Sequence, residues 1–314
     1  MPSPRAIVIG CGISGLTTAL CLQQAGREVE IVAADLPPAT TSAVAAAFWY
    51  PYLAFPRERV LQWSARTFEV LTEEAHHPLS GVWIAEAREL FRSPRPDPWW
   101  VLPGHHFERV SAQELPEGYA GAHRFSVPVA EMPLYLDHLW RRFVGRGGVV
   151  RQRRLERLSE LGGAPVVNCA GLGSMTLADD RTLAPIRGQI VRVANPGLRS
   201  VLLDEDNPGG DTYVVPRSKD CVLGGTAIES DWSTAPDPAT ATAIRDRCLE
   251  LEPRLREAPV LGHQVGLRPG RPSVRVEREP TRSGQVLVHN YGHGGAGLTL
   301  SWGCAEEAAA LALS

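Results

Sequence analysis

The sequence Ala6-Ile7-Val8-Ile9-Gly10-Cys11-Gly12-Ile13-Ser14-Gly15 joins a short apolar run to three spaced glycines near the start of the chain. The apolar run is typical of a fully buried parallel strand. Residues 13–25 are typical of a helix that stops at Gly26, and the apolar run at 29–32 predicts a second strand. The segment therefore predicts one strand–helix–strand unit.

The glycines follow the spacing GxGxxG between the strand and the helix. Gly10 permits the tight turn, Gly12 lets the backbone approach a pyrophosphate, and Gly15 allows the helix to pack closely on the strand. Ile13 and Ser14 lie at the amino end of the helix, which offers N–H donors and positive partial charge to phosphates.

Asp35 stands about twenty residues further on, at the end of the second strand, where a carboxylate accepts hydrogen bonds from ribose hydroxyls. No arginine for a 2′-phosphate is near it. Together with the glycine motif, this predicts an adenine dinucleotide, but it does not distinguish FAD from NAD.

A second glycine-rich segment, His289-Asn290-Tyr291-Gly292-His293-Gly294-Gly295-Ala296-Gly297-Leu298-Thr299, follows a predicted strand and leads into a predicted helix. Glycines let backbone lie against a flat, bulky group, and the helix amino end directs positive charge at it. A reduced flavin carries negative charge near N1 and C2=O, so the segment favours FAD. A plain glycine-rich turn with a helix cap is the alternative. No metal site is expected at His289 and His293, because glycines flank His293 and no third ligand is apparent.

The composition excludes several classes of protein. The 314 residues carry a net charge of −3, and basic residues are dispersed apart from a run at 151–154, so no nucleic acid is expected. No apolar stretch is long enough to span a membrane. Neither a signal peptide nor a peroxisomal tail is apparent, so we expect a cytoplasmic protein. The six cysteines are scattered, which argues against a zinc site but leaves a disulfide open.

Further periodic segments predict an α/β fold. It consists of a Rossmann-like FAD-binding domain with an inserted, mostly antiparallel α+β substrate domain. The FAD-binding domain is expected from residues 1–54, 128–188 and 282–314, and the substrate domain from 55–127 and 189–281. Alternating apolar runs between 188 and 225 predict antiparallel strands. Helices are expected at 58–74, 132–143, 240–255 and 298–313.

The chain resembles the D-amino-acid oxidase family of FAD-dependent oxidases over essentially its whole length. The resemblance implies oxidation of D-amino acids to 2-oxo acids, ammonia and hydrogen peroxide, with FAD as cofactor and oxygen as electron acceptor. Whether the protein forms a homodimer stays open. The matching stretches are Val8 to Gly15, Thr40 to Ala46 with Trp49 and Pro51-Tyr52, Val167 to Gly171, Arg187 to Gln189, Thr212 to Pro216, Gly266 to Pro272 and His289 to Gly303.

In that family an arginine binds the substrate carboxylate through two parallel, charge-assisted hydrogen bonds. The resemblance gives this role to Arg271 in the motif Arg-Pro-x-Arg-Pro, and also places Arg271 at the cofactor. Arg268 is the competing arginine. An ion pair of Arg271 with Glu277 or Glu279 is the alternative to both roles.

The resemblance also implies that Tyr213 donates a second hydrogen bond to the carboxylate and that the Gly295 carbonyl accepts one from the substrate amine. Core packing is the alternative for Tyr213. Vertebrate members carry another tyrosine, on a mobile lid, four positions before the one that matches Tyr213. Gly209 stands there instead, which leaves the limits on substrate size open and argues against lid-gated product release.

The same resemblance assigns residues to the cofactor. Thr40, Thr41 and Ser42 match a loop that binds the phosphates and ribityl chain, although a helix cap is the alternative. Thr299 is expected near the flavin C2=O, and the Leu155 backbone at the adenine. The remaining cofactor residues that it implies are Ala46, Ala47, Gly292, Gly294, Gly295, Gly297 and Leu298.

The implied reaction is hydride transfer from the substrate Cα to flavin N5, and it requires no side-chain base. A D-aspartate oxidase would need an additional cation, for which Arg217 is a candidate. A glycine or sarcosine oxidase would share the cofactor lobe but not the arginine motif. An NAD-dependent dehydrogenase would leave the second glycine-rich segment unexplained, and a non-catalytic flavoprotein would bind FAD without producing peroxide.

Overall fold

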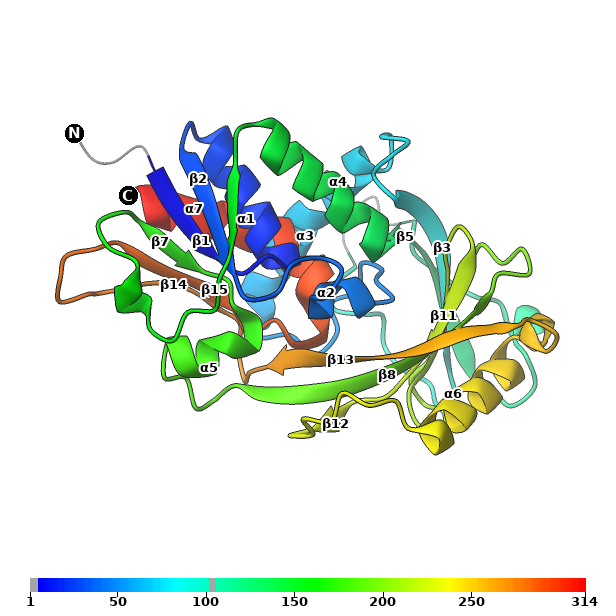
Figure 1. The fold of residues 1–314 in the computed structure, drawn as a ribbon. Coiled ribbons are helices and arrows are strands. Elements are labelled where there is room, and N and C mark those ends of the chain that lie inside the picture. The colour runs from blue at the N-terminus through cyan, green and yellow to red at the C-terminus, as the bar shows by residue number, and fades with distance from the viewer. Residues whose placement is uncertain (1–4, 102–105) are drawn as a thin grey trace.

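The computed structural model describes residues 5–101 and 106–314, and within these ranges the strands form two sheets, one of six strands and one of nine (Figure 1). Residues 1–4 and 102–105, which the predicted domain boundaries include, lie outside the described residues. The mixture of a parallel and a mainly antiparallel sheet confirms the predicted α/β fold.

The first sheet is parallel apart from one edge strand. Its strands are β1 (Arg5–Ile9), β2 (Glu28–Ala33), β6 (Val149–Gln152), β7 (Val166–Asn168), β14 (Arg275–Glu279) and β15 (Leu287–Tyr291). The order is β14-β15-β7-β1-β2-β6, and β14 runs antiparallel to β15. Val8 packs into one apolar cluster, while Ile7 and Ile9 pack into another on the opposite face. The sheet is thus buried on both faces, as the apolar run of β1 predicts.

The helices vary from single turns to five turns. They are α1 (Ile13–Gln24), α2 (Thr41–Val44), α3 (Arg57–Glu74), α4 (Met132–Gly145), α5 (Ser174–Leu177), α6 (Pro238–Leu251) and α7 (Gly297–Leu313). The 3₁₀ turns are η1 (Ala112–Glu114), η2 (Leu158–Glu160), η3 (Gly171–Gly173), η4 (Pro253–Leu255) and η5 (Gly294–Ala296). The helix predicted at 240–255 ends early, because Glu252 takes an extended conformation before Pro253.

The first and last helices of the chain pack side by side over the six-stranded sheet (Figure 1). The Thr17 hydroxyl of α1 donates to the Ser301 carbonyl of α7 at 3.2 Å. On another side of α7, a Cβ added to Gly303 would lie 2.4 Å from the Trp63 carbonyl oxygen, so α3 packs in close contact. The segments that begin and end the chain therefore build one lobe.

The second sheet is antiparallel except where β3 pairs with β9. Its strands are β3 (Val82–Phe91), β4 (Glu108–Arg109), β5 (Gly121–Ala130), β8 (Ala184–Ala194), β9 (Val201–Asp204), β10 (Thr212–Pro216), β11 (Asp220–Gly224), β12 (Ile228–Glu229) and β13 (Val260–Gly270). The strands predicted between 188 and 225 are confirmed as β8, β10 and β11. Helix α6 covers one face, where Ile244 and Cys248 pack against Val191 and Leu223. Asp237 begins this helix by accepting a hydrogen bond from the Thr240 N–H at 2.7 Å.

Two elements pack against segments that the sequence analysis assigned to the other domain. Strand β14 lies in residues 189–281, expected in the substrate domain, yet it pairs with β15, the next strand along the chain, in the six-stranded sheet. Helix α3 lies in residues 55–127 and packs against α7. Thr67 of α3 and Trp302 of α7 are 235 positions apart, so local periodicity carries no sign of that contact.

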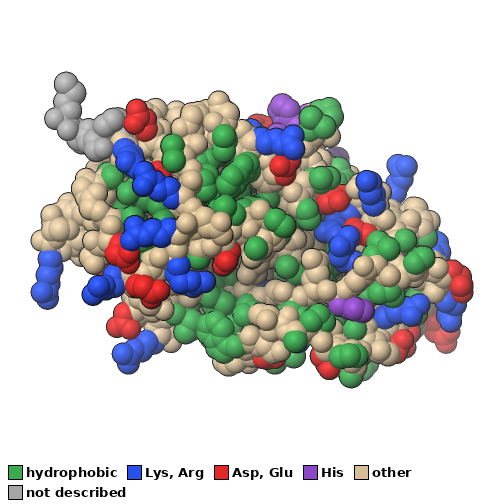
Figure 2. Space-filling view, viewed as in Figure 1, with side chains coloured by type: hydrophobic (Ala, Val, Ile, Leu, Met, Phe, Trp, Pro, Cys, Tyr) green, Lys and Arg blue, Asp and Glu red, His purple; other side chains and the backbone are tan. Residues whose placement is uncertain are grey.

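On the face drawn in Figure 2, acidic and basic side chains are interspersed rather than gathered into a patch of one sign. Among the described residues, no helix combines the length and apolar character needed to cross a membrane.

Candidate active site

A cavity of about 540 Å³ lies between the two lobes and is lined by residues of both sheets. On the six-stranded side it opens at the carboxyl end of β1. There the sheet order reverses, since β2 pairs on one side of β1 and β7 on the other. Ligands of open parallel sheets bind at this kind of position. On the nine-stranded side, β10 and β13 supply the walls.

The first glycine motif forms one end of this cavity, and its backbone tolerates no side chain. Gly10 has φ +100°, and an added Cβ would lie 2.5 Å from the Cys169 carbonyl oxygen. A Cβ on Gly15 would lie 2.0 Å from the Gly10 oxygen. These contacts agree with the roles expected for the turn and for close helix packing. Ser42 reaches the same place, where its Oγ accepts from the Ile13 N–H at 3.0 Å.

Most of the predicted cofactor residues line this cavity. They are Gly10, Gly12, Ile13, Ser14, Asp35, Thr40, Thr41, Ser42, Ala46, Ala47, Leu155, Gly294, Gly295, Gly297 and Leu298. Segments separated by more than 250 residues in the sequence thus meet around one space, with the amino ends of α1 and α7 both at its wall.

Four predicted cofactor residues do not line the cavity: Arg271, described below, and Gly15, Gly292 and Thr299. Gly15 serves the packing of α1. Gly292 has φ +83°, and an added Cβ would lie 2.8 Å from Cδ of Arg271. The Thr299 hydroxyl donates to the Tyr50 carbonyl and accepts from the Tyr50 N–H, both at 3.0 Å. Its hydroxyl is therefore occupied by the Tyr50 backbone.

The two histidines of the second glycine-rich segment are both held by protein groups. His289 Nε2 lies 3.0 Å from Glu279 Oε2, and His293 Nε2 lies 3.1 Å from Asn290 Oδ1. Burial lowers the pKa of His293 to about 4, so its ring is neutral at pH 7. In the ranges 5–101 and 106–314 no three His, Cys, Asp or Glu side chains are grouped to hold a metal ion.

Arg268 lines the cavity from β13, on the side of the nine-stranded sheet, whereas the glycine motif lines it from the side of the six-stranded sheet. Its guanidinium packs directly on Gly188, because a Cβ added to Gly188 would lie 2.6 Å from Arg268 Cζ. Nη1 donates to the Thr226 carbonyl at 2.8 Å. Tyr213 lines the same side, and burial raises its pKa although the neighbouring Arg268 opposes the shift. The Arg268 guanidinium, held by Thr226, and the protonated Tyr213 hydroxyl therefore lie at the same cavity.

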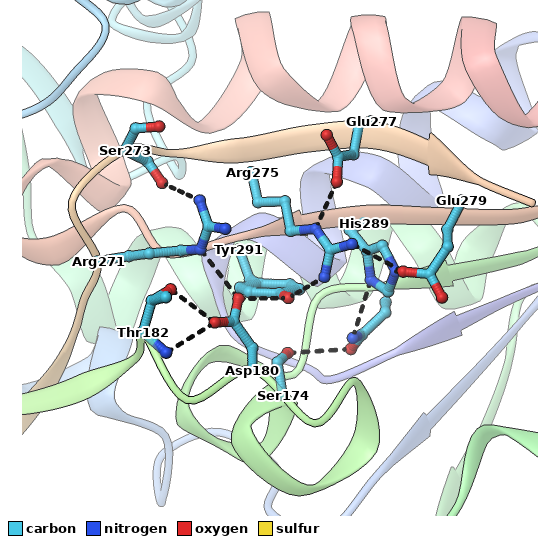
Figure 3. Close-up of polar contacts among 11 residues, drawn as sticks. Ser174, Asp180, Thr182, Arg271, Ser273, Arg275, Glu277, Glu279, His289 and Tyr291 are labelled. Atoms are coloured by element: carbon cyan, nitrogen blue, oxygen red, sulfur yellow. Dashed lines mark hydrogen bonds and ion pairs between the residues drawn. The ribbon is translucent and has the colours of Figure 1, made fainter.

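Arg271 is not among the residues that line the cavity. Figure 3 shows its side chain bonded to Asp180 and Ser273 instead. Its Nε donates to Asp180 Oδ2 at 2.9 Å and its Nη1 to the Ser273 carbonyl at 2.6 Å. The Tyr291 hydroxyl donates to the same Asp180 oxygen at 2.9 Å. Burial alone would raise the pKa of Asp180, but the hydrogen bonds from Thr182, Arg271 and Tyr291 bring it well below its usual range. Arg271 therefore forms an ion pair with a carboxylate of the protein. The sequence analysis gave such an ion pair as an alternative, but with Glu277 or Glu279 rather than with Asp180.

The two arginines lie in different places because strand β13 ends at Gly270, between them. Arg268 lies within the strand, where its pairing with Ile186 fixes the direction of its side chain. Arg271 follows the strand end, where the chain turns toward Asp180. Strand alternation does not single out Arg268, because residues 266–269 all line the cavity.

Four further lining residues had no role in the sequence analysis: Tyr50, Tyr52, Glu205 and Asp211. The Tyr52 hydroxyl donates to Asp211 Oδ2 at 3.0 Å. Burial, followed by the charges of Glu89 and Asp211, raises the pKa of Glu205 to about 7. Both carboxylates flank the turn at 207–210, and acidic residues beside a turn ordinarily face solvent. The sequence therefore carries no signal for their position.

Arg217, the candidate for a second carboxylate, does not line the cavity. Its Nε and Nη2 each donate to Asp220 at 2.7 Å, and both side chains are buried.

The chain is similar to known proteins over nearly its whole length. It is 58% identical over 311 residues to a D-amino-acid oxidase of Rubrobacter xylanophilus, which covers 98% of this chain and 95% of that protein. It is 36% identical over 327 residues to a human D-aspartate oxidase, covering 99% and 95%. The crystal structure of a glycine oxidase from Geobacillus kaustophilus shares the fold, with a TM-score of 0.82, 17% identity and coverage of 98% and 95%. A sequence profile of the family described as FAD dependent oxidoreductase matches residues 5–311, and the chain belongs to that family.

Proposed function

We propose that this protein oxidises D-amino acids to 2-oxo acids, ammonia and hydrogen peroxide, with FAD as cofactor. The observation that carries the proposal is the position of Arg268 and Tyr213 on one side of the cavity that the glycine motif lines from the other. The names of the relatives, D-amino-acid oxidase and D-aspartate oxidase, support the same reaction class.

The residues at the glycine end fit FAD. The N–H groups in the first turn of α1, close to Gly12, suit a pyrophosphate, and Asp35 suits a ribose. The first turn of α7 directs its N–H groups at the cavity beside Gly295, which suits the electron-rich edge of a flavin. FAD, when bound there, supplies a ring that takes a hydride and passes the electron pair to oxygen.

The protein's own groups orient the substrate. Arg268 binds the carboxylate with the donors that it does not spend on Thr226, and the Tyr213 hydroxyl donates one more hydrogen bond. The Gly295 carbonyl accepts from the substrate amine. With carboxylate and amine both fixed, the Cα–H points in one direction, and this positioning supplies much of the rate enhancement. No side-chain base is assigned, because His293 is held by Asn290 and the step needs none.

A D-aspartate oxidase is the less suitable alternative. It needs a cation for the second substrate carboxylate, and Arg217 is bound to Asp220 outside the cavity. The cytoplasmic location, the division into two domains at the expected boundaries and the choice between monomer and homodimer stay predictions.

A screen for hydrogen peroxide tests the proposed function. Purified protein supplied with FAD is expected to become yellow and to release peroxide with D-amino acids but not with L-amino acids. Glycine and sarcosine serve as further substrates in the panel. A flavin-loaded protein that releases no peroxide with any D-amino acid contradicts the proposal.

A further inference from the structure

We propose that the cavity selects D-amino acids with a cationic side chain, such as D-lysine or D-arginine, whose charge binds between Glu205 and Asp211. This inference rests on the proposed function, because it names the substrate class of that same site.

The two carboxylates lie at the substrate end of the cavity. Both line it together with Arg268 and Tyr213. Tyr52 lies against both Asp211 and Gly295, whose carbonyl is expected to accept from the substrate amine. Its hydroxyl donates to Asp211, and a Cβ added to Gly295 would lie 3.0 Å from Tyr52 Cδ1. A substrate held by Arg268 and Gly295 therefore has carboxylate oxygens within the same pocket for its side chain.

Glu205 and Asp211 differ from the carboxylates around them in having no cationic partner. Asp204 pairs with Arg92 at 3.1 Å and Asp206 with Arg95 at 2.6 Å. Glu89, behind Tyr50, also pairs with Arg95, at 2.8 Å. For Glu205 and Asp211, by contrast, no Lys, Arg or His nitrogen of residues 5–101 or 106–314 lies within ion-pair distance. The neighbouring acidic side chains are thus paired with arginines, whereas Glu205 and Asp211, which line the cavity, have no ion-pair partner among the described residues.

The charge balance favours a cationic ligand over the other classes. Two carboxylates without an ion pair in a partly buried site raise each other's energy in the ionised form. The pKa of Glu205 is raised first by burial and then by the charges of Glu89 and Asp211. A substrate ammonium or guanidinium relieves the repulsion and forms charge-assisted hydrogen bonds. A second carboxylate on the substrate adds a third negative charge, so D-aspartate and D-glutamate are excluded. An apolar side chain leaves both carboxylates desolvated without a cationic partner.

The test compares D-lysine with D-norleucine, which has the same chain but lacks the ammonium group. The FAD-loaded protein is assayed for peroxide at pH 8, and kcat/KM is measured for both. We expect D-lysine to be preferred by about tenfold or more, the effect of one charge-assisted hydrogen bond. Glu205→Gln keeps the shape of the side chain and is expected to lower this ratio by about tenfold. Asp211→Asn is expected to lower it in the same direction.

Asp206→Asn is the matched control, because it removes a carboxylate from the next residue, which does not line the cavity. It is expected to leave the ratio unchanged. If D-norleucine is oxidised but D-lysine is not preferred, the inference is wrong and the proposed function stands. The same holds if neither Glu205→Gln nor Asp211→Asn changes the ratio. If no D-amino acid is oxidised, both fail. Should Glu205→Gln not fold, Asp211→Asn alone decides between these outcomes.

Discussion

Arg268 and Arg271 are three positions apart, yet only Arg268 faces the cavity. We expect Arg268→Ala to lower kcat/KM for D-amino acids by about 100-fold or more, because two charge-assisted hydrogen bonds to the carboxylate are lost. The protein should keep its flavin absorbance, since the glycine motif is distant. Steady-state kinetics on the flavin-loaded variant provides the measurement.

Arg271→Ala is the comparison at the neighbouring arginine. It leaves the Asp180 carboxylate without its cation, so we expect a lower melting temperature, equivalent to roughly 1–3 kcal/mol, and an unchanged KM. The opposite result, with KM raised by Arg271→Ala and not by Arg268→Ala, would show that Arg271 binds the substrate carboxylate, as the sequence analysis expected.

The protonation of Glu205 predicts how substrate binding depends on pH. Its pKa is raised to about 7 by burial, Glu89 and Asp211, while Tyr50 and Arg95 oppose the shift. Glu205 is protonated below this pKa and ionised above it, so KM for D-lysine is expected to fall as pH rises from about 6 to 8. Between pH 6 and 8 the neutral fraction of the α-amine rises by the same factor in D-lysine and in D-norleucine, so KM for D-norleucine provides the reference. If KM depends on pH in the same way for D-lysine and D-norleucine, Glu205 does not bind the substrate side chain.

At the scale of elements, the turn between β1 and α1 is fixed by backbone contact. Because a Cβ on Gly15 would lie 2.0 Å from the Gly10 oxygen, Gly15→Ala forces β1 and α1 apart. We expect a loss of about 2 kcal/mol or more in stability and reduced flavin content. Gly145→Ala, in α4, meets no atom within 4 Å and is the control. Thermal unfolding and the ratio of flavin to protein absorbance measure the two effects, and equal behaviour of the two variants contradicts this account.

Elements defined by local pattern were predictable. The strand–helix–strand unit, α3, α4 and α7 follow from periodicity, glycine stops and turn residues close by in sequence. What the sequence alone did not reveal depends on distant partners. The contact of α3 with Gly303 is one case. The cavity position of Glu205 is another, since Glu89 of β3 and Tyr50, both far from it in sequence, are among its neighbours.

At the scale of the whole molecule, the cavity is shared by both lobes, so a ligand that fills it stabilises both. We expect the melting temperature to rise with FAD concentration, because binding to the folded state alone adds RT ln(1 + [L]/Kd) to its stability. A single transition should shift. NAD is the control and is expected to shift it far less. Two transitions, of which FAD moves only one, would show that the lobes unfold independently.

The contact between α1 and α7 also has a consequence for biosynthesis. The ribosome synthesises β1 and α1 well before α7, and the apolar surface of α1 is covered only once α7 has emerged. Until then the nascent polypeptide exposes this surface to chaperones and to other unfinished copies. Truncation within α7 should therefore send the recombinant product to inclusion bodies, whereas the untruncated protein should stay in the soluble fraction.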